Sequence, residues 1–164
     1  MRTLLIILLF AVSLPAGSVD DMTVGRWQIV THSTSANRTH ITEKEILGLK
    51  ADHTLDITIL VSLKKDEHFI KDLQFRATGI WKRHTTTLVL VIQKIEVPFA
   101  KEVSRTITKR SMEALAAVYQ SRLTESPIRI NTITLLTDKK MTIINEKGVS
   151  TSYTKYLPSP LKQK

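Results

Sequence analysis

The sequence has no cysteine, only 5 glycines among 164 residues, and aromatic side chains at 5% of its positions. Without cysteine the chain has no disulfide, no thiolate ligand for a metal and no thiol nucleophile. Five glycines are too few for a glycine-rich phosphate loop, and no Gly-x-Ser-x-Gly elbow occurs. The acidic residues of the central region, such as Asp56 and Asp72, fall in polar positions or loops, so paired buried carboxylates are not indicated. We therefore expect a protein that is not an enzyme and that requires no cofactor.

A metal site would require clustered ligands. No two histidines stand three or four residues apart beside a carboxylate. The histidines are His32, His40, His53, His68 and His84. Because the last three fall in predicted turns, solvated side chains are the default interpretation, and we expect no metal site.

Only one long hydrophobic run is present, from Leu4 to Leu14, broken by Ser13. A positive residue precedes it, Pro15 follows, and small residues come next. This order is typical of a cleaved secretory signal, which we assign to residues 1–18. The run is too short for a transmembrane anchor, which takes about 20 apolar residues. We expect a periplasmic or secreted protein with no transmembrane segment after cleavage.

The charge is strongly positive, with 24 Lys and Arg against 15 Asp and Glu. These basic residues are scattered in doublets such as Lys64-Lys65 and Lys139-Lys140, whereas nucleic-acid binding requires a concentrated basic face. We therefore expect no nucleic-acid partner. An anionic component of the cell envelope or an acidic protein is the partner class that the charge favours.

Most of the chain after the signal alternates between apolar and polar residues. From Leu55 to Leu63 the odd positions are apolar, and Phe69 to Trp81 repeats the pattern after a polar loop. Such alternation predicts strands with one face in a core and the other in water. A third strand, Thr85 to Glu96, is apolar on both faces around Leu88–Ile92, so another element must cover its outer face.

After Pro98 the spacing of apolar residues changes to three and four. This spacing predicts an amphipathic helix from about Arg105 to Thr124, stopped by Ser126-Pro127. We expect this helix to cover the doubly apolar strand.

Further strand-like segments begin and end the domain. Ile128–Ile130 and Ile133–Leu135 differ in phase, which predicts a bulge near Asn131-Thr132. The remaining segments are Trp27–Ser33, Met141–Asn145 and Ser150–Tyr156. The pattern predicts a mainly β domain over residues 19–157, with about eight antiparallel strands in a barrel or sandwich. Residues 158–164 are expected to form a disordered tail.

Several short motifs follow one another in a recognisable order. The domain opens on Gly25-Arg26-Trp27, and Leu49-Lys50-Ala51-Asp52-His53-Thr54 leads into a strand. Gly79-Ile80-Trp81-Lys82 comes next, and late in the chain stand Leu136-Thr137-Asp138-Lys139 and Tyr153-x-Lys155. Over nearly all of the domain this set resembles the bacterial lipocalin-like domains of the calycin group, which implies a small antiparallel barrel. The predicted helix lies between strands 5 and 6, whereas in true lipocalins the long helix follows the eighth strand.

The resemblance suggests a structural role for each motif. Trp27 would plug one end of the barrel, and Asp52 and Thr54 would brace a turn through side-chain hydrogen bonds to the backbone. His53 stands where similar domains have glycine, so this residue is expected to adopt a positive φ or to alter the turn. Gly79 would permit a bend or make room for a neighbour.

Two functions remain open from the sequence. The first is binding of a small apolar or amphiphilic ligand inside the barrel. Its candidate ligand-binding residues are Trp27, Phe75, Trp81, Leu115 and Tyr119. The second is a packed barrel without a pocket, since large inward residues fill a small barrel, acting as an interaction module through its basic loops.

Overall fold

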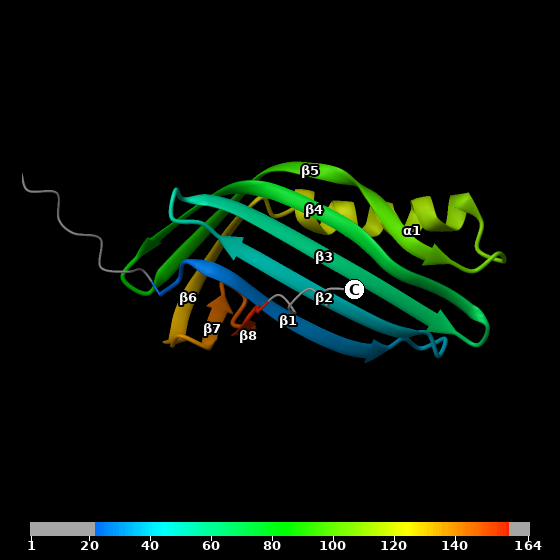
Figure 1. Ribbon diagram of the computed structural model, residues 1–164, viewed down its shortest axis with the longest axis horizontal. Coiled ribbons are helices and arrows are strands. Elements are labelled where there is room, and N and C mark those ends of the chain that lie inside the picture. The colour runs from blue at the N-terminus through cyan, green and yellow to red at the C-terminus, as the bar shows by residue number, and fades with distance from the viewer. Residues whose placement is uncertain (1–21, 158–164) are drawn as a thin grey trace, which may run out of the picture.

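The alternating segments form the strands of a closed antiparallel barrel (Figure 1). The computed structural model describes residues 22–157, so the predicted signal peptide, residues 1–18, and the predicted tail, residues 158–164, lie outside the described residues. The strands are β1 (Gly25–Thr34), β2 (His40–Leu49), β3 (Thr54–Lys65), β4 (His68–His84), β5 (Thr87–Val103), β6 (Ile128–Leu136), β7 (Lys140–Asn145) and β8 (Ser150–Lys155). One helix, α1 (Lys109–Thr124), lies between β5 and β6. The predicted fold class and the position of the helix are confirmed.

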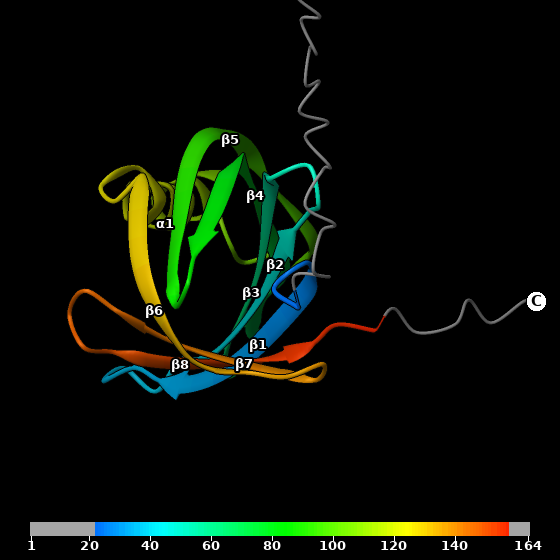
Figure 2. The ribbon, with the colours of Figure 1, turned by 90° about the vertical axis from the view of Figure 1, so that its left-hand side faces the viewer.

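Each strand pairs with the next one in the chain, and β8 returns to β1 to close the ring (Figure 2). The closing contact is short, because β1 and β8 pair only at Trp27↔Lys155 and Gln28↔Thr154. The pairing of β5 with β6 also ends early, at Val91↔Ile128. As a result, β1 to β5 extend well beyond the short strands β6 to β8 at one end. We call this end, where the ring of paired strands is incomplete, the wide end of the barrel, and the opposite end the narrow end.

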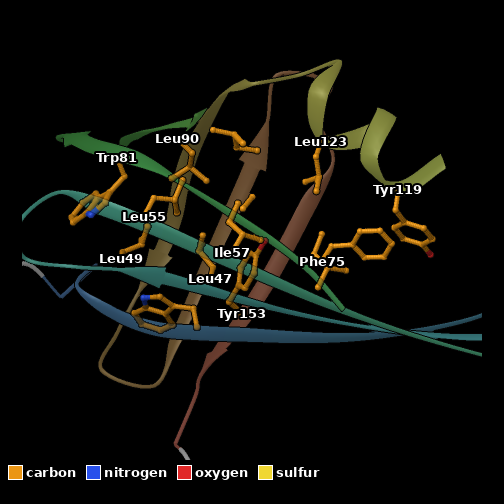
Figure 3. Close-up of a cluster of buried hydrophobic side chains, with 14 of the residues drawn as sticks. Leu47, Leu49, Leu55, Ile57, Phe75, Trp81, Leu90, Tyr119, Leu123 and Tyr153 are labelled. Carbon is orange, nitrogen blue, oxygen red and sulfur yellow. The ribbon is translucent and has the colours of Figure 1, made fainter. Parts of the chain in front are cut away.

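The inward face of the sheet forms one hydrophobic core. On β3 the residues Leu55, Ile57, Ile59 and Val61 are all buried, as the alternation predicts. Figure 3 shows Trp81 at one end of this cluster and Tyr119 at the other. Burying a side chain of this size contributes roughly 1.5–3 kcal/mol, so the core supplies most of the driving force for folding.

Two tryptophans close the narrow end. Trp27 is fully buried, and its indole Nε1 donates a hydrogen bond to the carbonyl of Thr23 at 2.8 Å. The ammonium of Lys155 lies 4.1 Å from the centre of the Trp27 ring. Trp81 donates from Nε1 to the carbonyl of Lys50 at 2.9 Å. Because each indole N–H has a backbone partner, both rings are fixed as structural parts of the barrel.

The turn before β3 has the conformation expected for its sequence. His53 adopts φ +63°, so a non-glycine residue does occupy the positive-φ position. The carboxylate of Asp52 accepts hydrogen bonds from the backbone N–H and the hydroxyl of Thr54, at 2.9 and 2.6 Å. These hydrogen bonds hold the pKa of Asp52 below its usual value.

Gly79 allows β4 and β5 to approach closely. A Cβ at this position would lie 1.9 Å from the carbonyl oxygen of Val91, and the register of the two strands shifts between Thr78 and Gly79. A side chain at position 79 would therefore collide with the backbone of β5, which cannot move aside as a flexible side chain could.

Some details differ from the sequence prediction. Asp72 has φ +50° beside a register shift between Val61 and Leu63, and its backbone N–H bonds the hydroxyl of Ser62 at 3.0 Å. This bulge changes the phase of β4, so Ile70 is 5% exposed and Phe69 is 37% exposed.

Element boundaries also differ. β5 continues through Pro98 to Val103, and α1 begins at Lys109, not near Arg105, because Thr108 caps it through a hydrogen bond to the N–H of Ser111. The register shift in β6 lies between Ile133 and Leu135, two residues after the predicted position.

The helix packs on the inner side of the barrel wall. Its buried residues Ala116, Tyr119 and Leu123 join the same core as the inward strand residues, and the Tyr119 ring stacks on Phe75 with centroids 5.1 Å apart. As expected, α1 packs against β5, but it lies on the inner side of this strand and does not cover its outer face. The helix instead covers the interior at the wide end, where the early end of β5–β6 pairing leaves the core open. In the described part of the chain, no helix has both the length and the apolar character to cross a bilayer.

Candidate functional site

A cavity of about 550 Å³ lies at the wide end of the barrel. It is bounded by the inward faces of β1 and β2, the ends of β6, β7 and β8, and the C-terminal end of α1. The cavity exists because β7 and β8 are short, so the sheet is incomplete between β1 and β6. A volume of this size accommodates a small molecule.

Two acidic side chains of β2 line this cavity. Glu43 and Glu45 share the inward phase of the strand with Leu47 and Leu49, which are fully packed in the core. Strand geometry places every second residue on the same face, so the carboxylates follow directly from the phase of the leucines. A charged residue in a core-facing phase is costly unless it has a partner.

Arg122 supplies the partner of Glu43. The guanidinium at the end of α1 donates two hydrogen bonds to the carboxylate, Nη2 to Oε1 at 2.9 Å and Nη1 to Oε2 at 3.2 Å. The carboxylate side is the more buried, with 18% of the Glu43 side chain exposed against 56% of the Arg122 side chain. This paired geometry ties the end of the helix to β2 across the mouth of the cavity.

Glu45 accepts a hydrogen bond from the phenol of Tyr153 at 2.8 Å. Burial of the phenol, with the negative charge of Glu45 beside it, raises the pKa of Tyr153 well above its usual value. Tyr153 is therefore a neutral donor that holds the carboxylate in place. Within residues 22–157, Glu45 has no ion pair.

Asn131 is the least expected group in the wall. It is only 6% exposed, and its side chain makes no hydrogen bond with any described residue. Every described side-chain nitrogen or oxygen that is sealed from solvent does have a partner, so the amide of Asn131 must be reached from the cavity. Its cross-strand neighbour Asn145 behaves differently, since its oxygen accepts from the backbone N–H groups of Lys147 and Val149 at 3.0 and 2.9 Å.

Arg129 lies two residues before Asn131 on the same face of β6 and also lines the cavity. It is half-buried, and it forms no ion pair with a residue of the described part of the chain. Its positive charge nevertheless reaches Tyr153, where it opposes the effect of Glu45. Arg129 and Glu45 are therefore two charged groups of opposite sign near one phenol.

Apolar side chains form the rest of the wall. Ile29, Leu90 and Ile143 lie toward the interior, and the rim carries exposed aliphatic groups such as Ile128, which is 56% exposed. Exposed isoleucines next to inward charges give the cavity an amphiphilic lining.

The five residues predicted to bind a ligand lie elsewhere in the barrel. Trp27 and Trp81 close the narrow end, Phe75 and Tyr119 stack on each other beneath α1, and Leu115 is half-buried on the helix. None of the five lines the cavity of about 550 Å³, and their contact with a ligand stays a prediction.

Tyr119 is the one of these five that is linked to the cavity. The guanidinium carbon of Arg122 lies 5.3 Å from the centre of its ring. Burial, together with the charge of Glu43, raises the pKa of Tyr119 to about 12. Its neutral phenol thus lies next to the pair formed by Glu43 and Arg122.

Besides Arg122, which was placed only on the polar face of the predicted helix, five polar groups of the site were missed by sequence reasoning. They are Glu43, Glu45, Arg129, Asn131 and Tyr153. The available signal was the phase, since Glu43 and Glu45 are separated from Leu47 and Leu49 by even numbers of residues.

A second, smaller hollow of about 230 Å³ lies where β5 separates from β6, between Ile92, Leu123 and Pro127. Among residues 22–157, no three His, Asp or Glu side chains come together in a way that could hold a metal ion.

No protein-family model matches the chain, and no curated protein matches it in sequence. The class that the structure defines is a closed eight-stranded antiparallel barrel with one helix across its wide end.

Proposed function

We propose that this domain is a binding protein, not an enzyme, and that it holds a small amphiphilic molecule in the cavity at the wide end of the barrel. One observation carries the proposal: a cavity of ligand size combines aliphatic walls with inward charged and amide side chains. A purely apolar ligand would fit less well. It would remove Glu45, Arg129 and Asn131 from water without offering any of them a partner.

The resemblance of the sequence motifs to lipocalin-like domains agrees with this function. We propose that the barrel is a lipocalin-like variant in which α1, inserted between β5 and β6, forms one side of the ligand site. The predicted signal at residues 1–18 further suggests that the protein acts in the periplasm or outside the cell.

Native mass spectrometry of protein purified from the cells that produce it tests the proposal. We expect an adduct with the mass of a small amphiphile. The matched variants are Thr31→Trp and Thr134→Trp, because both threonines are exposed and both make only a long hydrogen bond to a backbone carbonyl, at 3.5 and 3.4 Å. Only Thr31 lines the cavity.

Loss of the adduct in Thr31→Trp and its retention in Thr134→Trp is the expected result. If the wild-type protein carries no adduct and binds no added amphiphile, the proposal fails. Salt-sensitive binding to an anionic surface through the basic loops would then become the better account.

A further inference from the structure

The two unpaired charges of the cavity, Glu45 and Arg129, define what kind of head group would fit there. This inference rests on the proposed function and specifies the chemistry of the ligand. We propose that the cavity recognises a zwitterionic head group, with a positive amine seated on Glu45 and a negative group seated on Arg129.

The other charges around the cavity are already compensated or solvated. Glu43 is neutralised by the paired hydrogen bonds from Arg122, and the charge of Arg122 also acts on Glu45 without forming an ion pair with it. Glu146 and Lys147 lie exposed in the turn between β7 and β8, where water screens them. Among the charged residues that line the cavity, Glu45 and Arg129 are the half-buried ones that form no ion pair with a described residue.

These two charges come from opposite sides of the site. Glu45 belongs to β2 and Arg129 to β6, and both act on the phenol of Tyr153 on β8, the first raising its pKa and the second lowering it. Both residues line the same cavity of about 550 Å³, so one small ligand can reach both, yet they do not form an ion pair with each other. A ligand with a single charge would leave one of them desolvated and unpaired, which is costly.

Asn131 provides the independent observation that this is a binding site. An amide that is 6% exposed and makes no side-chain hydrogen bond carries a donor and an acceptor into the cavity. A zwitterion can satisfy both, because its amine donates to the amide oxygen and its anionic group accepts from the amide nitrogen. Without such a ligand, only water in the cavity is left to meet the donor and the acceptor of this amide.

Calorimetric titration of the purified protein with four eight-carbon compounds tests the head group while the tail stays constant. The compounds are octanol, octanoate, octylamine and 2-aminooctanoate, which is zwitterionic at pH 7. We expect 2-aminooctanoate to bind about tenfold or more tightly than each of the others, as a second charge-assisted hydrogen bond would provide.

Two variants separate the charges. Glu45→Gln keeps an oxygen that accepts the hydrogen bond from the phenol of Tyr153. It should lower the affinity for 2-aminooctanoate by about tenfold and leave the affinity for octanoate unchanged. Arg129→Gln should weaken 2-aminooctanoate to a similar degree and leave octylamine unchanged. Glu67→Gln and Arg105→Gln are the controls, since they remove the same charges at exposed positions that do not line the cavity.

The outcomes distinguish the two proposals. If none of the four compounds binds, the proposed function fails and this inference fails with it. If all four bind alike, or if octanoate or octylamine matches 2-aminooctanoate, the binding function stands and the zwitterion is refuted. Octyl phosphoethanolamine carries the head group of a membrane lipid on the same tail. If it binds more tightly than 2-aminooctanoate, the ligand is assigned to the lipids. If 2-aminooctanoate binds more tightly, the ligand is assigned to free amino acid derivatives.

Discussion

Replacing Asn131 with leucine should make the protein more stable and a weaker binder. The two side chains have nearly the same shape, so the substitution removes the amide without opening a void. Asn131 is 6% exposed and has no side-chain partner among the described residues. Burying an amide without a hydrogen bond costs about 1–3 kcal/mol by mutational measurements. Because water in the cavity can reach the Asn131 amide, the cost lies in the lower part of that range. We therefore expect Asn131→Leu to raise the free energy of unfolding by about 1–2 kcal/mol.

Asn145→Leu is the matched control on the opposite strand. The two asparagines are cross-strand partners and both line the cavity, but the oxygen of Asn145 accepts two backbone N–H bonds in the turn between β7 and β8. Losing these bonds should lower the free energy of unfolding by about 1–2 kcal/mol.

Urea unfolding followed by tryptophan fluorescence measures both effects, since Trp27 and Trp81 are buried. Asn131→Leu should raise the urea midpoint with an unchanged slope, and Asn145→Leu should lower it. Because the Asn131 amide is proposed to contact the ligand, Asn131→Leu should also weaken the binding of 2-aminooctanoate. Equal destabilisation by Asn131→Leu and Asn145→Leu would show that the Asn131 amide has a stabilising partner after all.

Three further predictions follow from the described contacts. Gly79→Ala should destabilise the barrel by about 3 kcal/mol or prevent folding, because its Cβ would meet the Val91 carbonyl; a melting temperature close to wild type would contradict this. A double-mutant cycle of Glu43→Gln and Arg122→Gln should give a coupling of about 0.5–1 kcal/mol, small because Arg122 is largely exposed, and zero coupling would show that the pair does not hold α1. The pKa of Tyr119 is about 12 in the folded protein, against the ordinary value of 10.0 for the unfolded chain. Ionisation of Tyr119 should therefore leave the free energy of unfolding unchanged below pH 10 and lower it as the pH rises toward 12. That fall should be shallower in Tyr119→Phe, and an equal slope in both proteins would refute the assignment.

The fold was largely predictable because most of its strands alternate regularly. Three features depend only on neighbouring residues and could therefore be predicted. They are the alternation from Leu55 to Val61, the turn at Asp52-His53-Thr54 and the change to helical spacing after Pro98. The bulge at Asp72 was missed because it depends on a cross-strand bond to Ser62, which sequence periodicity does not contain.

The site was not predictable by the same reasoning. No strand was assigned to β2, because Glu43 and Glu45 interrupt the apolar phase that continues in Leu47 and Leu49. The two glutamates that line the cavity thus also interrupt the alternation by which β2 could have been recognised as a strand. Sequence reasoning favoured large aromatic residues as ligand contacts. In the structure Trp27 and Phe75 fill the core, where packing needs bulk.

An amphiphile bound in the polar cavity at the wide end of the barrel would change the surroundings of the side chains that line it. The most direct measurement is the change of side-chain and backbone NMR signals of the ¹⁵N-labelled protein on addition of 2-aminooctanoate. We expect the side-chain amide signal of Asn131 to shift most, together with the backbone signals of Glu45 and Tyr153. Shifts confined to basic turns such as Lys64-Lys65 and Lys139-Lys140, with the Asn131 amide unmoved, would contradict this expectation.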